Sequence, residues 1–323
     1  MLLVRTIAII NQKGGVGKTT SVTNLSAAIA AAGYATCVID MDPQAHLTLS
    51  LGVEPDTNIQ GTYHILTGDT TIEQALRPVQ ENLHMVASSI DLAAAEVELV
   101  GTVGREQILR DRVAELTRPF DFILIDCPPS LGLLTLNALA AADDVIIPLQ
   151  PHFLALQGLG KLLETVALVQ RRINSKLRVS GVMLCMYETS TRLAGEVLAD
   201  LRNFFESARG TSVPWADARI FETVIRRNIK LAECPSYGRD IFRYEPSSNG
   251  ASDYAGLAME FLESYGKSAT LDVASAAAQQ GVIDAPPEAP AGEAAPAAPV
   301  PTAHHQDAPA ENVTDEAAKT PAQ

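Results

Sequence analysis

Short apolar segments alternate with longer stretches of mixed polarity over residues 1–265 of the 323-residue chain. The apolar segments are rich in β-branched residues and hardly alternate with polar ones, which is typical of strands covered on both faces. They occupy residues 6–10, 36–39, 122–125, 145–147 and 179–184. Because strand and helix signals take turns along the chain, we predict an α/β fold, with a doubly wound, mostly parallel sheet and helices on both faces.

The stretch between the first two predicted strands has the period of a helix. Apolar side chains recur there at helical spacing, and Gly33 supplies a left-handed residue at which a helix can stop. These side chains are Val22, Leu25, Ala28, Ile29 and Ala32. The chain therefore opens as a strand, a glycine-rich loop, a helix and a second strand.

A change in composition divides the chain near residue 265. From Ala269 onward Ala, Pro, Glu and Gln predominate, and a segment with so few large apolar side chains cannot bury enough surface to offset its ordering entropy. We predict a globular domain over residues 1–265 and a disordered, acidic, Ala/Pro-rich tail over residues 266–323. The tail is either a solubilising extension or a segment that recruits a partner or competes for a basic surface.

The charge of the chain is unevenly distributed. A formal net charge of −14 argues at first against a nucleic-acid partner, because polyanions repel each other. Residues 268–323 hold eight acidic side chains and one lysine, so 1 − 8 gives −7 for the tail. Residues 171–243 hold thirteen Lys and Arg against eight Asp and Glu, a local +5 that weakens the objection.

The sequence favours a cytoplasmic protein. Charged or turn residues interrupt the apolar stretches well before the roughly 18 consecutive positions that a membrane span needs. The first residues lead directly into the glycine-rich loop without a cleavage site, so they read as a strand rather than a signal peptide. The four cysteines, Cys37, Cys127, Cys185 and Cys234, have no CxxC spacing, and we expect core thiols rather than disulfides or a metal cluster.

Residues 14–19, GGVGKT, have the chemistry of a nucleotide-binding loop. Glycines let backbone N–H groups curl around phosphates, Lys18 can neutralise the β- and γ-phosphates, and the Thr19 hydroxyl can face Mg²⁺. The position of the loop between a strand and a helix makes a ligand-free glycine turn the weaker interpretation. The predicted nucleotide contacts in this stretch are Gly14, Gly15, Val16, Gly17, Lys18, Thr19 and Thr20.

Three motifs in order carry a family resemblance. The first glycine of the common G-x-x-x-x-G-K-T pattern is Gln12 here, and KGGVGKTT over residues 13–20 resembles instead the deviant Walker A motif of the ParA/MinD class of P-loop ATPases. DMDPQAHLT over residues 40–48 is similar to the acidic motif of that class. FILIDCPPSLG over residues 122–132 looks like its Walker B strand.

The resemblance implies roles for three further side chains. Lys13 is similar to the signature lysine that reaches across a dimer to the nucleotide of the other subunit, which would make it catalytic together with Lys18 and Asp42. Asp126 follows a buried strand and would support Mg²⁺ through a water, unless it only caps the turn at Pro128 and Pro129. Asp42 would orient the attacking water, with helix N-capping before Pro43 as the alternative.

The C-terminal half resembles the ParA/Soj branch of that class over residues 179–197 and 221–262, and the whole likeness covers residues 4–265. It implies ATP and Mg²⁺ as cofactors, an ATP-dependent homodimer, non-specific binding to double-stranded DNA, and hydrolysis stimulated by a ParB-type partner on the nucleoid. No basic amphipathic helix of the MinD kind ends the chain, so we expect no membrane binding. Residues 1–5 are too few for a helix-turn-helix domain ahead of the first strand.

Cationic side chains of the C-terminal half are the predicted DNA contacts. We select Arg192, Arg227 and Lys230, with Arg202, Arg226 and Arg243 as weaker candidates. The resemblance also suggests that adenine lies against Asn228. Ser190 and Arg226 depart from the family pattern, since Ser190 stands in place of an arginine and Arg226 in place of a proline, which could redistribute the DNA contacts.

Alternative functions use the same fold. The chain could position a different cargo, such as a protein array or microcompartment, through another adaptor. It could also cycle on a membrane like MinD, or bind nucleotide without turnover.

Overall fold

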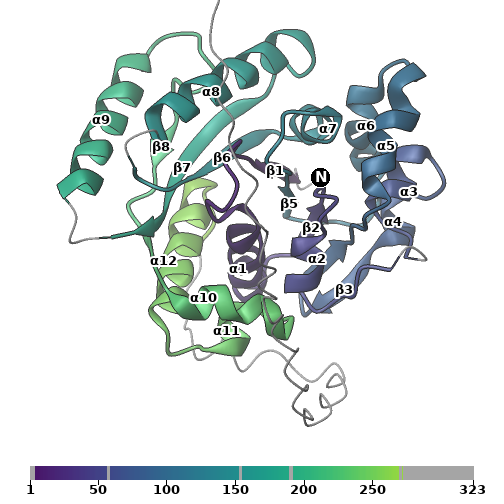
Figure 1. Cartoon of the computed structure of the whole chain (residues 1–323), viewed down its shortest axis with the longest axis horizontal. Coiled ribbons are helices and arrows are strands. Elements are labelled where there is room, and N and C mark those ends of the chain that lie inside the picture. Colours follow the sequence, from purple (N-terminus) through teal and green to yellow (C-terminus); the bar gives the residue numbers. More distant parts are fainter. Residues whose placement is uncertain (1–3, 57–58, 153–154, 189–191, 269–270, 272–323) are drawn as a thin grey trace, which may run out of the picture. The chain divides into compact units, whose positions relative to one another are not determined.

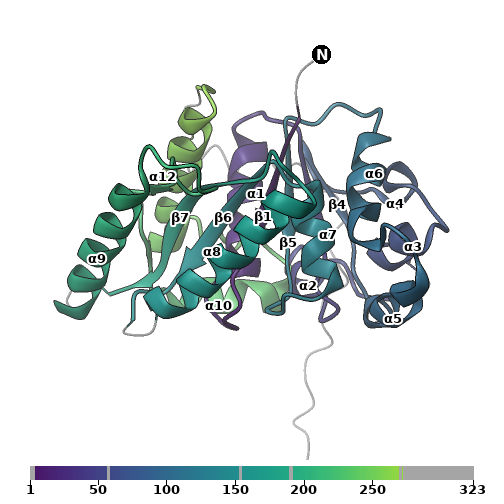
Figure 2. The same cartoon turned by 90° about the horizontal axis from the view of Figure 1, so that it is seen from above.

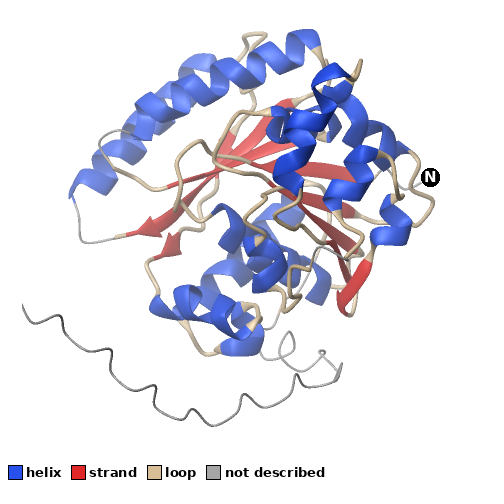
Figure 3. Cartoon of the chain, turned by 45° about the vertical axis from the view of Figure 1, so that its right-hand side comes forward, coloured by secondary structure: helices blue, strands red, loops and turns tan. Residues whose placement is uncertain are grey.

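The computed structural model describes residues 4–56, 59–152, 155–188, 192–268 and 271, which lie in one compact unit over Met1–Ile283. A sheet with the strand order β3-β4-β2-β5-β1-β6-β7-β8 forms its centre, and β9 pairs with the far end of β7. All pairings are parallel except the one between β3 and β4. Figure 3 shows this sheet between two layers of helices, which confirms the predicted doubly wound α/β fold.

The five predicted strands are present, with ends shifted by up to three residues. They are β1 (Arg5–Ile9), β2 (Thr36–Asp40), β5 (Phe122–Asp126), β6 (Asp144–Leu149) and β7 (Arg178–Tyr187). The remaining strands are short: β3 (Arg77–Gln80), β4 (Leu83–Val86), β8 (Arg219–Ile220) and β9 (Ile225–Arg226). In β1, Ile7 and Ile9 face one layer of the core while Ala8 faces the other, so both faces are covered and the strand shows no polar alternation.

Each face of the sheet has its own set of helices (Figures 1 and 2). One face packs against α1 (Lys18–Ala31), α2 (His46–Ser50), α10 (Ile229–Glu233), α11 (Ile241–Tyr244) and α12 (Asn249–Ser264). The other packs against α3 (Thr62–Thr67), α4 (Ile72–Ala75), α5 (Leu92–Glu98), α6 (Ile108–Ala114), α7 (Leu133–Ala141), α8 (Ala155–Arg172) and α9 (Arg192–Ala208). Three 3₁₀ turns complete the unit: η1 (Leu99–Gly101), η2 (Arg105–Gln107) and η3 (Cys234–Tyr237).

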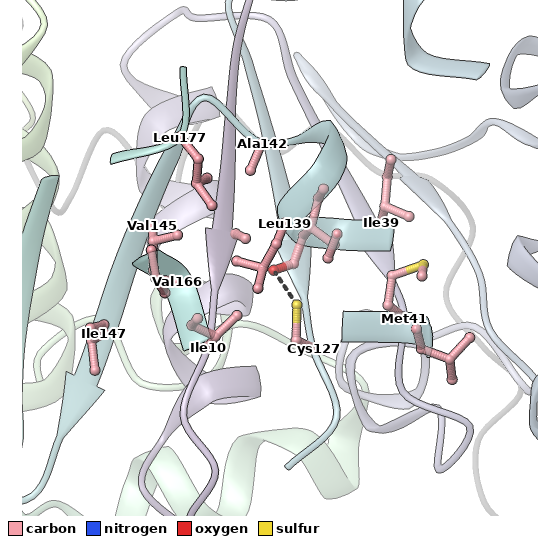
Figure 4. Packing of buried hydrophobic residues seen from close by; sticks show 14 of the residues in the cluster. Ile10, Ile39, Met41, Cys127, Leu139, Ala142, Val145, Ile147, Val166 and Leu177 are labelled. Carbon is pink, nitrogen blue, oxygen red and sulfur yellow. Dashed lines mark hydrogen bonds between the residues drawn. The ribbon is translucent and has the colours of Figure 1, made fainter. Parts of the chain in front are cut away.

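The carboxyl ends of the central strands meet at one edge of the sheet. Asp126 is paired in register with both Ile9 and Asp40, so the last residues of β1, β2 and β5 lie side by side. Figure 4 shows the apolar layer on the α7 side of this edge, where Ile10, Met41 and Cys127 follow these three strands. The loops that leave this edge are therefore held by a fully buried core.

All four cysteines are buried free thiols, as core cysteines were predicted to be. Cys127 lies directly after Asp126, and Cys185 on β7 lies behind the glycine-rich loop, where a β-carbon on Gly17 would approach its Cβ to 3.5 Å. Burial raises the pKa of Cys185 to about 12. At neutral pH these positions therefore behave as small apolar packing groups.

The contacts of the globular domain continue slightly beyond residue 265. Lys267 Nζ lies 2.8 Å from Asp121 Oδ1, and Tyr34 donates a hydrogen bond to the Ser268 carbonyl at 2.8 Å. Lys267 and Ser268, which the sequence division placed in the tail, thus pack on the sheet domain. The predicted disordered tail otherwise lies outside the described residues, apart from Leu271.

Candidate nucleotide-binding site

The loop between β1 and α1 is shaped by two glycines with positive φ. Gly15 has φ +71° and Gly17 has φ +94°, conformations that side chains other than glycine rarely adopt. A β-carbon on Gly14 or Gly15 would meet nothing within 4 Å, so the backbone of the loop is open on that side. Val16 is buried and anchors the loop. Successive backbone N–H groups in a loop of this kind can bind an anion.

Lys18 begins α1 at the bottom of this loop. The residue is only 7% exposed, and its ammonium donates to the Lys13 carbonyl at 3.4 Å. Burial lowers the pKa of Lys18, while the carboxylates of Asp126 and Asp42 act in the opposite direction. An anionic ligand would stabilise a buried ammonium, so this placement is compatible with the phosphate role of Lys18, which stays a prediction.

Thr19 and Asp126 form the polar pair expected for magnesium. Thr19 Oγ1 donates to Asp126 Oδ2 at 2.7 Å, and Asp126 is fully buried. Asp126 Oδ1 has no hydrogen-bond partner among the described residues. A hydroxyl and a carboxylate oxygen suit a cation that takes oxygen ligands and keeps several waters, so these residues fit Mg²⁺.

The charge on Asp126 depends on its surroundings. Burial, and after it the charge of Asp40, raises the pKa of Asp126 well above its ordinary value. The hydrogen bond from Thr19 and the charge of Lys18 act against this rise. A divalent cation would favour the ionised form. Among the described residues Asp126 Oδ2 accepts from Thr19 and Oδ1 has no partner, so no hydrogen bond ties the carboxylate to the turn at Pro128 and Pro129.

Asp42 lies in the loop after β2, buried, and within electrostatic range of Lys18. Its Oδ1 accepts from Gln44 N at 2.9 Å, which makes a local turn. The alternative interpretation as a helix N-cap is wrong, because α2 begins only at His46, after Ala45 with φ +53°. The carboxylate is therefore free of a helix-capping role and sits at the same sheet edge as Lys18.

A buried clamp holds the backbone of Asp42. Its N–H donates to Asp40 Oδ1 at 3.1 Å, and its carbonyl accepts from Ser88 Oγ at 2.8 Å. Asp40 also accepts from Thr48 N at 2.9 Å and from Thr48 Oγ1 at 2.7 Å, and burial raises its pKa to about 6. No role was predicted for Asp40, although an acid that ends a buried strand two residues before Asp42 was a usable signal.

The Lys13 side chain contacts a second loop, different from the glycine-rich loop that it precedes. Its Nζ is 2.6 Å from His152 Nε2, which follows β6 and is 139 residues distant in the sequence. Its backbone N–H donates to Asn11 Oδ1 at 3.0 Å, and Asn11 in turn donates to the Pro148 carbonyl at 2.7 Å. The ammonium of Lys13 is thus exposed at the mouth of the site, held by a second loop rather than by the residues around Lys18.

Replacing Lys13 by alanine is expected to raise the pKa of His152. Burial and the positive charge of Lys13 lower that pKa at present, so His152 is neutral at pH 7 and can accept the lysine hydrogen bond. Removing the cation eliminates both a repulsive charge and the bond to the neutral form, and both changes favour protonation. An NMR titration of the imidazole would measure this, with the signal assigned through His152→Gln.

Lys176→Ala serves as the control for that titration, because Lys176 precedes β7 at the opposite edge of the sheet. It should leave the pKa of His152 unchanged. A pKa that stays constant or falls in Lys13→Ala would show that the two side chains do not interact in solution.

The remaining predicted nucleotide contacts lie at the same edge. Thr20 occupies the first turn of α1, and its carbonyl accepts from Asn24 at 2.8 Å. Asn228 follows β9, whose Ile225 pairs with Cys185, the residue that packs behind Gly17. The Asn228 side chain accepts from Lys230 N at 2.8 Å and so caps α10. The fold thus brings Asn228 to the region of the glycine-rich loop. The contact between Asn228 and adenine stays a prediction.

The described cationic candidates all have acidic partners. Arg227 Nε lies 3.2 Å from Glu188, Lys230 Nζ lies 2.9 Å from Glu233, and Arg202 Nη2 lies 3.4 Å from Glu222. These pairs are exposed and can exchange their partners at little cost. The Arg192 side chain and Ser190 lie outside the described part of the structure.

Two of the weaker candidates have structural contacts instead. Arg226 donates from Nε and Nη2 to both carboxylate oxygens of Asp253, which joins β9 to α12. Arg243 Nε lies 2.6 Å from Asp240 Oδ2, and its side chain is mostly covered. A role in the fold therefore accounts for the position of both side chains.

No helix among the described residues is long and apolar enough to cross a bilayer. Residues 4–179 match a family model described as an AAA domain. The chain is 43% identical over 261 residues to the chromosome partitioning protein ParA of Myxococcus xanthus, covering 80% of this chain and 88% of the relative. It is 44% identical over 260 residues to the chromosome-partitioning ATPase Soj of Treponema pallidum, covering 80% and 97%.

Among solved structures, a Mycobacterium smegmatis protein described as cobyrinic acid a,c-diamide synthase with bound ATP analogue and magnesium has the same fold. The TM-score is 0.68 at 35% identity, covering 84% of this chain and 100% of that one. Fold, site and family model together define a P-loop ATPase with ATP and Mg²⁺ as its ligands. Within that class the chain belongs to the ParA/Soj family of chromosome-partitioning ATPases, with a ParA-like role in partitioning.

Proposed function

We propose that ATP closes two copies of this chain face to face, that the dimer binds nucleoid DNA without sequence preference, and that a ParB-type partner stimulates hydrolysis and release. The observation that supports the dimer is the placement of Lys13. Its ammonium lies 2.6 Å from His152 on an exposed residue, while its carbonyl contacts Lys18. A cation at the mouth of one site can reach a nucleotide held by a facing subunit.

Few residues need to act in the hydrolysis itself, because phosphoryl transfer depends on positioning and charge neutralisation. Lys18 and the backbone of residues 14–19 hold the phosphates. Magnesium, when bound, supplies further positive charge there. Asp42 orients the attacking water, and Asp126 with Thr19 supports the metal, while Lys13 of the facing subunit adds the cation that completes the site.

DNA binding would use the exposed cations of the C-terminal half, Arg192, Arg227 and Lys230. Arg227 and Lys230 lie close in sequence beside β9 and α10, and their ion pairs with Glu188 and Glu233 are on the surface. An exposed ion pair contributes about 0–1 kcal/mol, so phosphates can replace these carboxylates. On this proposal the protein is cytoplasmic and associated with the nucleoid. The cargo to which the ParB-type partner binds is chromosomal DNA.

Binding of this chain to DNA is expected to require ATP and to weaken steeply with salt. Each phosphate contact contributes about 0.9 to the slope of log affinity against log salt. Arg227→Ala should therefore lower the slope by about 0.9 for each subunit. The measurement is fluorescence anisotropy with two unrelated duplexes at several salt concentrations, in an Asp42→Ala background that keeps ATP intact.

Arg110→Ala is the matched control, since Arg110 forms a similar surface ion pair with Asp111 on α6, which packs on the opposite face of the sheet from α10 (Figures 1 and 2). For Arg110→Ala, the slope of log affinity against log salt should equal that of the parent protein. Binding with ADP as strong as with ATP, or binding indifferent to salt, would contradict the proposed switch.

A further inference from the structure

Helix α5 carries apolar side chains on two opposite faces. Leu92, Ala95 and Leu99 are buried in the core. On the other side Ile90, Val97 and Val100 are 61%, 75% and 64% exposed, and Ala93 and Ala94 between them are exposed as well. Ala93, Ala94, Val97 and Val100 have helical spacing and so share one side of the helix and its 3₁₀ extension, and Ile90 lies in the turn two residues before α5. We call Ile90, Ala93, Ala94, Val97 and Val100 the α5 stripe.

A surface helix normally exposes polar side chains on the side away from the core, and a helix that is apolar all round is normally covered. Single exposed apolar residues need no explanation, but adjacent ones often mark an interaction site. Helix α9 differs from α5 in this respect, because its exposed side chains include Glu196 and Asp200. The α5 stripe therefore has the composition of a surface that another molecule covers.

Residues next to the α5 stripe contact the nucleotide site at two places, the Asp42 clamp and the loop after Asp126. Ser88, two residues before the α5 stripe, donates from Oγ to the Asp42 carbonyl and from its N–H to Thr48 Oγ1 at 2.9 Å. Glu96, on the same helix, lies so close to Gly132 in the loop after Asp126 that a β-carbon there would overlap its carboxylate. Figure 2 shows α5 near the same edge as α2, at the carboxyl ends of the strands.

Charge around the α5 stripe is acidic. The ionisable side chains of residues 89–104 are Asp91, Glu96 and Glu98, and Glu98 accepts from the Tyr63 hydroxyl at 3.0 Å. The nearest cation in sequence, Arg105, donates to the Val100 carbonyl and pairs with Glu106 at 3.3 Å. Two α5 stripes packed on each other would bring these carboxylates together, which disfavours a second copy as the occupant.

We propose that the α5 stripe is the docking site of the activating partner, which binds it through a segment carrying both apolar and basic side chains. This inference rests on the proposed function, because it assigns a place to the partner that stimulates hydrolysis. Five small or medium side chains offer far less than the roughly 800 Å² per partner of a stable interface, so the contact is transient. Docking acts on Asp42 through Ser88 and on the loop after Asp126 through Glu96.

A dye at position 97 tests the proposal directly. The native cysteines are all buried, so Val97→Cys can be labelled selectively with an environment-sensitive fluorophore. Leu168→Cys, half exposed on α8, is the matched control. The full chain in the Asp42→Ala background receives ATP first and the ParB-type protein of the same organism second. We expect a blue shift at position 97 only on the second addition, and none at position 168.

Phosphate release provides the second readout. In otherwise wild-type protein, Val97→Ser and Val100→Ser should each lower the partner-stimulated rate at least tenfold. Leu168→Ser should leave the partner-stimulated rate unchanged. All three variants should keep the unstimulated rate of the wild type. A shift at position 97 with ATP alone would assign the α5 stripe to a second copy and overturn the proposal. No shift at position 97 with the partner, or undiminished stimulation of the serine variants, would also overturn it.

The two hypotheses remain separable in this design. If the ParB-type protein does not accelerate hydrolysis by the wild-type chain, the proposed function fails. The dye then still decides the docking site, because it detects binding without turnover.

Discussion

A Lys13→Ala protein is expected to bind ATP with the affinity of the wild type and yet to remain monomeric in its presence. The Lys13 ammonium is held by His152, so its removal should leave Lys18 and the glycine-rich loop to bind the phosphates of its own site. A cation supplied by the facing subunit would act as an arginine finger does. An arginine finger increases the rate of hydrolysis by about a thousandfold or more. The stimulated rate of phosphate release should fall by about that factor.

Light scattering with ATP and Mg²⁺ measures the assembly, and a fluorescent nucleotide measures the affinity. His152→Ala is the informative control, because it removes the partner of Lys13 but leaves the lysine, and it should still dimerise. A Lys13→Ala protein that dimerises normally would contradict the role in the facing subunit. One that loses ATP affinity would show that Lys13 acts on its own nucleotide.

Local sequence patterns were enough to predict the parts of the fold that neighbouring residues determine. The apolar runs identified β1, β2, β5, β6 and β7, because both faces of each are buried and leave a continuous apolar signal. The glycine-rich loop and Lys18 follow β1 directly, and Asp126 ends β5. The adjacent strand in the sequence was therefore enough to predict where each of them lies in the fold. Strand ends were less accurate, since β7 continues to Tyr187 through residues that pair with β9.

The contacts that the sequence did not reveal join residues far apart in the chain. Lys13 meets His152 across 139 residues, and Asp42 meets Ser88 across 46. Which loops come together depends on the strand order, and no local pattern contains that order. The net charge of a segment does not reveal such contacts either. The local +5 of residues 171–243 does not show that Arg226 is held by Asp253. The outer face of α5 was missed because its apolar residues look like core residues until the fold shows them exposed.

An Asp42→Ala protein is expected to retain ATP binding and dimerisation while its hydrolysis falls by about 10²–10⁴, the range for loss of a group that positions or deprotonates a nucleophile. The fold should tolerate the change. The bonds from the Asp42 N–H to Asp40 and from Ser88 to the Asp42 carbonyl involve only backbone atoms of residue 42 and persist. Only the bond from Gln44 N to the side chain is lost, at about 1 kcal/mol.

Removing this carboxylate also relieves repulsion, because the charge of Asp42 is one of those that raise the pKa of Asp126. ATP affinity should therefore be equal to that of the wild type or somewhat higher, and the protein should stay on DNA when the ParB-type partner is added. Single-turnover phosphate release separates chemistry from binding. Ser88→Ala, which loosens the clamp but keeps the carboxylate, should give an intermediate rate. If Asp42→Ala hydrolysed ATP at the wild-type rate, the attacking water would have to be oriented by another group; Asp40, which ends β2, is the nearest acid in sequence.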